Sequence, residues 1–112
     1  MKILFVENHN VFAEIVTKIF LADHNVTVVS TVSQAWKYIN KNKYDIILID
    51  YDLDDCKGNT LVRRIKQNNL PVKIIGVSSH DDGNAALKKA GADAICSKMK
   101  FKQIDYVIKN LI

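Results

Sequence analysis

Residues 46 to 49, Ile-Ile-Leu-Ile, form an unbroken aliphatic run with no polar residue at alternate positions. A strand with one face in water alternates apolar and polar residues, so this run predicts a strand that is covered on both faces. Similar short runs occur at residues 3–6, 74–77 and 94–97, and amphipathic stretches separate them. This alternation predicts repeated βα units, in which helices cover both faces of a parallel sheet.

Five βα units fit the chain, with a second strand expected at residues 25–30. The first helix is expected to end near residues 22–23 and to bury a stripe at helical spacing, made of Phe12, Ile15, Val16, Ile19 and Phe20. Thr31 and Gln34 have the spacing of a capping box and predict the start of the second helix, which buries Ala35, Trp36 and Ile39.

The third helix is expected from about Asn59 to Asn68, and Pro71 marks the turn into the fourth strand. Asp81 or Asp82 is expected to cap the fourth helix, which ends at Gly91 in a left-handed conformation. We expect this helix to be the least firmly held, because its apolar face is small and consists of Ala85, Ala86 and Ala90. The last helix has a longer apolar stripe, formed by Ile104, Val107, Ile108 and Leu111.

Length and composition narrow the function classes. A chain of 112 residues predicts one domain, residues 1–112, with no room for an output domain. The net charge is +4, but the Lys and Arg residues are spread over several helical segments, which argues against nucleic-acid binding. There is no membrane-length apolar run and no signal-peptide pattern at the start, so we expect a cytoplasmic protein. Cys56 and Cys96 lack metal-binding or CxxC spacing and are expected to be free thiols.

Polar residues suited to phosphoryl chemistry follow four of the expected strands. Asp50 follows the strand at residues 46–49, and Glu7 with Asn8, Ser78 and Lys98 follow three other strands. Ligands of parallel α/β sheets lie just beyond the carboxyl ends of the strands. The sequence therefore predicts that carboxylates, a hydroxyl group and an ammonium group converge at one edge of the sheet.

Three segments share a specific pattern of order and spacing. They are Tyr44 to Asp50 with Leu53, Gly58 and residues 61–65 downstream, Val77 to Asp82, and Gly91 to Ala94 followed by Lys98. Over essentially the full chain these residues resemble the receiver domain of bacterial two-component response regulators, the CheY-like family. The resemblance implies a single-domain, doubly wound α/β fold of the flavodoxin-like type, with a five-stranded parallel sheet in the order 2-1-3-4-5.

The resemblance also implies roles for the strand-end residues. Asp50 is the phosphoacceptor, Ser78 takes the Ser/Thr position and Lys98 the lysine position. The implied Mg²⁺ ligands are Glu7, Asn8, Asp50 and the backbone carbonyl of Asp52. A cation and a lysine neutralise the charge that opposes attack of a carboxylate on phosphorus, and a hydroxyl group donates to a phosphoryl oxygen.

The function implied is that of a phosphorelay module rather than an enzyme in the usual sense. The chain would take a phosphoryl group from a sensor histidine kinase or a histidine phosphotransfer protein and later release it by autodephosphorylation. It would then signal by contact with a downstream protein, as a monomer or weak dimer.

Three residues depart from the family pattern. Asn8 stands where a second acid is usual, so the metal site lacks one negative charge and we expect weak Mg²⁺ binding. We hypothesise that the side chain of Asp52 partly restores that charge. Met99 replaces the proline after Lys98, which predicts a trans peptide bond there. Ile95 replaces the switch aromatic, so ring rotation cannot report phosphorylation.

Other readings of the same residues stay open. With Asn8, Met99 and Ile95, the chain could be a receiver-like docking module that binds partners without being phosphorylated. A haloacid-dehalogenase-type phosphatase would use Asp50-Tyr51-Asp52 as its Asp-x-Asp motif, but Lys98 is followed by a single acid, Asp105. A flavodoxin-like nucleotide binder is disfavoured because the loop after the first strand has no glycine and carries a negative charge.

Overall fold

The computed structural model describes residues 1–112 and shows a single parallel sheet of five strands in the order β2-β1-β3-β4-β5. The strands are β1 (Lys2–Val6), β2 (Asn25–Val29), β3 (Ile46–Ile49), β4 (Lys73–Gly76) and β5 (Ala94–Ile95). The α-helices are α1 (Asn10–Phe20), α2 (Val32–Lys41), α3 (Gly58–Gln67), α4 (Asp81–Ala90) and α5 (Ile104–Leu111), and a 3₁₀ helix, η1 (Lys98–Gln103), precedes α5. The predicted fold class and strand order are confirmed.

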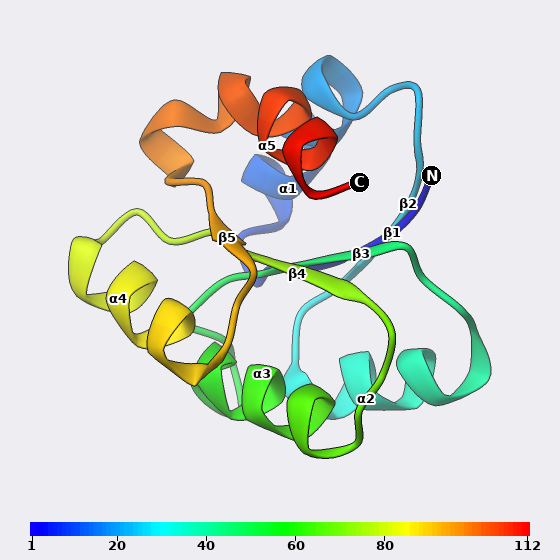
Figure 1. Ribbon diagram of the computed structural model, residues 1–112. Coiled ribbons are helices and arrows are strands. Elements are labelled where there is room, and N and C mark those ends of the chain that lie inside the picture. The colour runs from blue at the N-terminus through cyan, green and yellow to red at the C-terminus, as the bar shows by residue number, and fades with distance from the viewer.

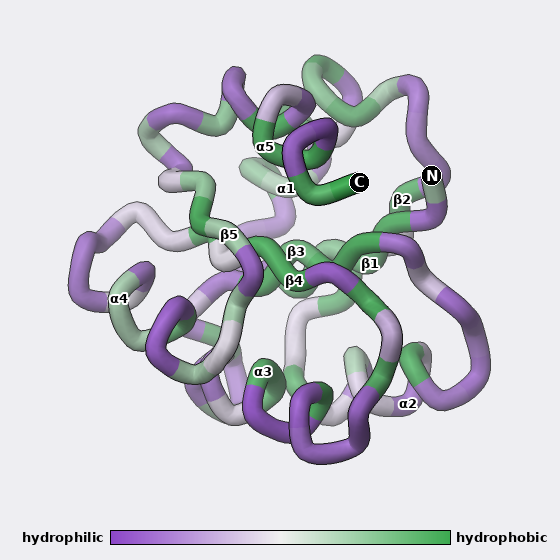
Figure 2. Tube along the Cα trace, in the orientation of Figure 1, coloured by the Kyte–Doolittle hydropathy of each residue, from purple (hydrophilic) through white to green (hydrophobic).

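The sheet forms the middle of three layers (Figure 1). Helices α1 and α5 cover one face, and α2, α3 and α4 cover the other. The strands are the most apolar part of the chain, while the helices present hydrophilic residues on their outer sides (Figure 2). Each face of the sheet therefore has its own hydrophobic core, as expected for strands that lack polar alternation.

All four residues of β3 are fully buried, which explains the aliphatic run at residues 46–49. In the sheet, Ile49 pairs with Val6 of β1 and with Gly76 of β4. This register aligns the carboxyl ends of the three strands. Consequently, the residues that follow Val6, Ile49 and Gly76 emerge at the same edge of the sheet.

The start of α2 confirms the predicted capping signal. The side-chain oxygen of Thr31 accepts a hydrogen bond from the backbone N–H of Gln34 at 3.0 Å. The Gln34 side chain reaches back and accepts from the backbone N–H of Ser30 at 3.1 Å. In a standard capping box, the second bond comes from the backbone N–H of the cap residue, here Thr31. In this helix it comes instead from the preceding residue, Ser30.

The predicted apolar face of α1 was partly wrong. Ala13 and Val16 are buried against the sheet, but Ile15 and Ile19 are 50% and 64% exposed. The helix also ends at Phe20, before the expected boundary. Phe12 and Phe20 are partly buried and pack against the same core, so three of the five predicted residues, Phe12, Val16 and Phe20, do face inward, with Ala13 beside them.

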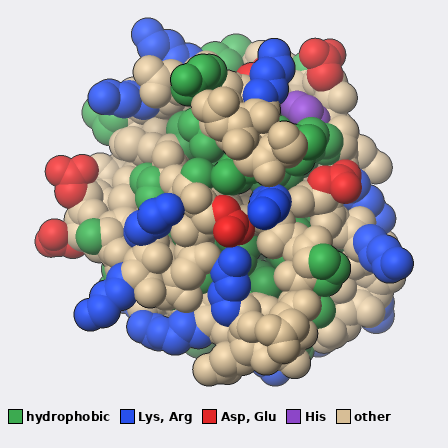
Figure 3. Space-filling view, in the orientation of Figure 1, with side chains coloured by type: hydrophobic (Ala, Val, Ile, Leu, Met, Phe, Trp, Pro, Cys, Tyr) green, Lys and Arg blue, Asp and Glu red, His purple; other side chains and the backbone are tan.

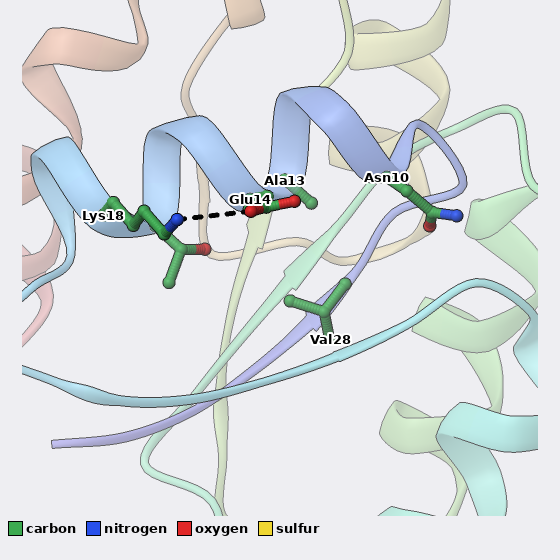
Figure 4. A pocket seen from close by; sticks show the side chains of 6 residues that line it. Asn10, Ala13, Glu14, Lys18 and Val28 are labelled. Carbon is green, nitrogen blue, oxygen red and sulfur yellow. Dashed lines mark hydrogen bonds and ion pairs between the residues drawn. The ribbon is translucent and has the colours of Figure 1, made fainter.

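A pocket lies between α1 and β2 and is lined by Asn10, Ala13, Glu14, Thr17, Lys18 and Val28 (Figure 4). Glu14 and Lys18 form an ion pair of 3.2 Å along its rim. None of the strand-end residues that the sequence singled out lines this pocket.

The predicted inner face of α4 was also wrong. Ala85 is exposed and Ala86 and Ala90 are only partly buried, whereas the buried residues are Gly83, Asn84 and Leu87. The N-cap is His80 rather than Asp81 or Asp82, and its side chain makes no capping hydrogen bond. Asn84 lies on the inner side of α4, where its side chain makes two hydrogen bonds to the backbone of Ser78. Gly91 ends α4 with a φ of +124°, so the left-handed conformation expected there is confirmed.

Further expectations from the sequence concerned membrane spans, the distribution of basic residues and the state of the two cysteines. No helix of this chain is both long and apolar enough to cross a bilayer. On the face shown in Figure 3, Lys and Arg side chains are scattered over several elements. Cys56 and Cys96 are both free, as predicted.

Candidate active site

The carboxyl ends of β1 and β3 and the start of η1 bring three charged side chains into contact. The Lys98 ammonium lies 3.0 Å from Oδ2 of Asp50 and 2.9 Å from the Glu7 carboxylate. Lys98 is separated from Asp50 by 48 positions in the sequence and from Glu7 by 91. The parallel sheet therefore assembles this cluster by joining strand ends that are distant in the chain.

Burial makes the charge balance of this cluster matter. Glu7 is fully buried and Asp50 is 3% exposed. Burial raises the pKa of Glu7 above its ordinary value, and the nearby Asp50 carboxylate raises it further, whereas the hydrogen bond from Lys98 lowers it. Two carboxylates thus share one ammonium group. A further cation at this site would relieve the remaining negative charge.

The Asp50 carboxylate is fixed from two sides. Its Oδ1 accepts a hydrogen bond of 2.8 Å from the backbone N–H of Tyr51, and its Oδ2 accepts from Lys98. Behind it, the first residue of α3 packs against the Asp50 backbone, and a Cβ atom on Gly58 would overlap the Asp50 carbonyl oxygen. Only glycine, which has no Cβ atom, allows the backbone at the start of α3 to lie this close to the Asp50 carbonyl. This accounts for the Gly58 seen in the sequence pattern.

Ser78 lies at the end of β4, beside the end of β3. It is 2% exposed, and its carbonyl accepts a hydrogen bond of 3.1 Å from the backbone N–H of Lys98. Its hydroxyl oxygen accepts from the backbone N–H of His80 at 3.1 Å. The hydroxyl proton remains available for donation to a ligand.

Asn8 is held by an acid that the sequence analysis did not single out. Its side-chain N–H group donates to Asp54 at 3.3 Å, while its Oδ1 is buried and has no hydrogen-bond partner. Asp54 therefore orients the amide so that its oxygen is left free. The acidic residues that follow β3, Asp52, Asp54 and Asp55, indicated that a carboxylate could lie near Asn8. Their positions in the sequence did not indicate which of the three makes the contact.

The side chain of Asp52 lies elsewhere. It is 52% exposed and forms an ion pair with Lys57, which raises the pKa of that lysine. The hypothesis that the Asp52 side chain replaces the missing charge near Asn8 is not supported, because Lys57 holds it and Asp54 contacts Asn8 instead.

The site has the donor atoms that a hard divalent cation needs. Oδ1 of Asn8 is a buried oxygen without a hydrogen-bond partner. Both carboxylate oxygens of Glu7 lie 2.9 Å from the Lys98 ammonium. Glu7, His9 and Asp50 each offer a ligand atom, and these atoms lie within 4.8 Å of one another. Mg²⁺ prefers oxygen ligands, so Glu7, Asn8 and Asp50 fit that ion. The His9 ring nitrogen lies 3.4 Å from the Lys98 ammonium, and its side chain is 69% exposed.

Met99 and Ile95 are the other two residues that depart from the family pattern. No peptide bond is cis, so the predicted trans bond between Lys98 and Met99 is confirmed. Met99 is 80% exposed, and its backbone N–H donates to the side chain of Ser97 at 3.2 Å. Ile95 packs on the core beneath α4, where a Cβ atom on Gly76 would lie 2.6 Å from its Cδ1.

Comparison with known proteins agrees with this geometry. The family model of the response regulator receiver domain matches residues 3–109. Protein RcaC of Microchaete diplosiphon is 31% identical over 110 residues, which cover 97% of this chain but only 16% of RcaC. The chain therefore spans about a sixth of that relative.

Solved structures show the same fold. A putative response regulator from Chloroflexus aurantiacus matches with a TM-score of 0.88 and 25% identity, over 97% of this chain and 94% of that one. The response regulator TrrA of Thermotoga maritima, solved in complex with Mg²⁺-BeF, matches with a TM-score of 0.85 and 20% identity over the full length of both chains.

Proposed function

This chain belongs to the response regulator receiver domain family of two-component systems, and we propose on that premise that it accepts a phosphoryl group on Asp50. Receiver domains interact with histidine kinases or phosphotransfer proteins and with downstream effectors, and they bind Mg²⁺ in an acidic pocket. The observation that carries the proposal for this chain is the contact of the Lys98 ammonium with both Asp50 and Glu7.

The Lys98 ammonium has two tasks in the proposed reaction. Before transfer, it offsets the repulsion between the Asp50 and Glu7 carboxylates, which lie in a buried environment. During transfer, it stabilises the negative charge on the phosphoryl oxygens at a site that largely excludes water. Because Lys98 is only 10% exposed, this charge is weakly screened.

In the transfer step, a carboxylate oxygen of Asp50 attacks the phosphorus atom of the donor. A P–O bond forms, the P–N bond to the donor imidazole breaks, and its electron pair stays on the donor nitrogen. The Tyr51 N–H group holds the Asp50 carboxylate in one orientation. The Ser78 hydroxyl group donates a hydrogen bond to a phosphoryl oxygen. Later attack by water on phosphorus releases phosphate and restores the Asp50 carboxylate.

Glu7, Asn8, Asp50 and the backbone carbonyl of Asp52 are the residues that would hold Mg²⁺. When bound, this ion neutralises negative charge on the carboxylates and on the incoming phosphoryl group. Asn8 supplies an oxygen but no charge, so we propose that the affinity for Mg²⁺ is low.

The test is incubation of the protein with Mg²⁺ and acetyl phosphate, followed by intact-mass measurement. We expect one added phosphoryl group that hydroxylamine removes, as it does from an acyl phosphate, and no addition to Asp50→Asn. Lys98→Met should slow uptake by about 100-fold, because it removes the cation beside the reacting carboxylate. Lys100→Met is the matched control, since Lys100 is exposed and its side chain contacts none of these groups.

Absence of any added mass on the wild-type protein would contradict the proposal and favour the docking module that acts without phosphorylation. Uptake that persists in Asp50→Asn would place the acceptor on another residue.

A further inference from the structure

Asn84 is a buried polar residue that the proposed reaction has not used. It lies in the first half of α4 and is 8% exposed. Its side-chain oxygen accepts a hydrogen bond of 2.9 Å from the backbone N–H of Ser78, and its side-chain N–H group donates to the Ser78 carbonyl at 3.0 Å. Asn84 therefore holds both polar groups of the Ser78 main chain.

These two bonds define where the Ser78 backbone lies. Its carbonyl also accepts from the backbone N–H of Lys98 at 3.1 Å, so Ser78 is held between α4 and the residue that contacts Asp50. The helix is packed directly against the hydroxyl group, because a Cβ atom on Gly83 would lie 2.6 Å from the Ser78 Oγ. Close packing and two hydrogen bonds thus leave Ser78 little freedom.

The chemistry of this contact requires a carboxamide group, which Asn84 supplies. One group must accept from an N–H and donate to a carbonyl of the same residue, and a carboxamide does both. An aspartate would keep the acceptor, lose the donor and bury a charge, while an alanine would leave the buried Ser78 N–H without a partner. The fourth helix therefore contributes to the site through an amide and not through its alanine residues.

We propose that Asn84 is a positioning residue of the phosphoryl site, which holds the Ser78 hydroxyl where it can donate to the phosphoryl group on Asp50. The inference rests on the proposed function. It also gives α4 a direct link to the site, because any shift of the Ser78 backbone moves Asn84 and the first turn of the helix with it.

The experiment is a double-mutant cycle on the rate of phosphoryl uptake from acetyl phosphate, with Asn84→Ala, Ser78→Ala and the double variant. We expect Asn84→Ala to slow uptake about tenfold, a loss typical of a misplaced donor. In the Ser78→Ala background, the same change should have no further effect on the rate, because the hydroxyl that Asn84 positions is already missing. A residue with a merely structural role would slow both backgrounds by the same factor, and that result would overturn the proposal.

Two further variants separate positioning from loss of stability. Leu87→Ala removes a fully buried side chain of the same helix without touching Ser78, and we expect it to lower the unfolding temperature but not the rate. If Leu87→Ala slows uptake as much as Asn84→Ala, the proposal is wrong. Asn84→Asp has nearly the same shape, so it keeps the test informative if Asn84→Ala does not fold, and it should slow uptake because it cannot donate to the Ser78 carbonyl.

The wild-type rate and the variant ratios answer different questions. A wild-type protein that takes up no phosphoryl group would contradict the proposed function and this inference with it. Normal uptake by the wild type and by Asn84→Ala alike would overturn only the role of Asn84.

Discussion

The side-chain amide of Asn8 donates a hydrogen bond of 3.3 Å to the carboxylate of Asp54. This bond turns the Asn8 oxygen away from Asp54 and leaves it buried without a hydrogen-bond partner. An uncharged residue thus occupies the proposed metal-ligand position, and the Asp54 carboxylate orients its side-chain amide.

The first prediction follows from that arrangement. Asn8→Asp should increase the affinity for Mg²⁺ about tenfold, because it adds a negative charge at a ligand position. Calorimetric titration measures the affinity directly. Asn10→Asp is the matched control, since it adds the same charge at an exposed position that lines the pocket beside β2 (Figure 4). Equal affinities in the wild type and Asn8→Asp would contradict the assignment of Asn8 as a ligand.

The same substitution is unfavourable in the absence of metal. The introduced carboxylate would face Asp54 with no proton to donate, and the two negative charges would then repel each other. We therefore expect Asn8→Asp to lower the unfolding temperature without Mg²⁺ and to recover it when Mg²⁺ is added.

The second prediction concerns pH. Asp55 accepts hydrogen bonds from the backbone N–H groups of Val32 at 2.9 Å and Ser33 at 3.1 Å, at the start of α2. Burial acts to raise the pKa of Asp55, but these and other backbone N–H groups outweigh it and hold the pKa below its ordinary value of 3.8. The stabilisation is complete above pH 3.8 and is lost as the pH falls below that value, through the lowered pKa of the folded state.

Asp55→Ala should lower the free energy of unfolding at neutral pH by about 1 kcal/mol, as the loss of a helix cap does. Its stability should also fall less than that of the wild type between neutral and acidic pH. Urea unfolding at a series of pH values measures both effects. Asp23→Ala is the control, because Asp23 is exposed and makes no hydrogen bond or ion pair. If the free energies of unfolding of the wild type and Asp55→Ala changed with pH in parallel, the hydrogen bonds from Val32 and Ser33 to Asp55 would not account for the acid sensitivity.

The third prediction concerns Gly58. Gly58→Ala should destabilise the protein by about 3 kcal/mol or more, because the new methyl group would overlap the backbone carbonyl of Asp50 and neither backbone can easily move. Gly91→Ala is a milder comparison. Its strain comes from a φ of +124°, and the nearest atoms belong to the flexible Lys66 side chain, so we expect a cost of about 1–2 kcal/mol. Chemical denaturation should rank the two variants in this order.

The fourth prediction concerns the response to phosphorylation. Ile95 packs against the core and cannot act through ring rotation, whereas α4 is tied to Ser78 through Asn84. With a beryllofluoride mimic of the phosphoryl group, hydrogen exchange should change most in residues 79–90. Unchanged protection there, with binding at Asp50 demonstrated, would show that the signal leaves by another route.

Local patterns in the sequence were sufficient to predict the sheet and the residues at its carboxyl edge. The aliphatic run at residues 46–49 requires burial on both faces, and Thr31 with Gln34 begins a helix through bonds between near neighbours. The contact of Lys98 with Asp50 was also predictable, because the carboxyl ends of parallel strands meet at one edge.

The tertiary structure alone decided which of several similar residues make the long-range contacts. Asp52, Asp54 and Asp55 are equivalent acids in one loop, yet they bind Lys57, Asn8 and the start of α2 respectively. The inner face of α4 likewise contains Asn84 and not the alanines that its composition suggested. Composition and spacing set the periodicity of an element, but its rotation against the sheet and the direction of each loop side chain depend on partners that are distant in the chain.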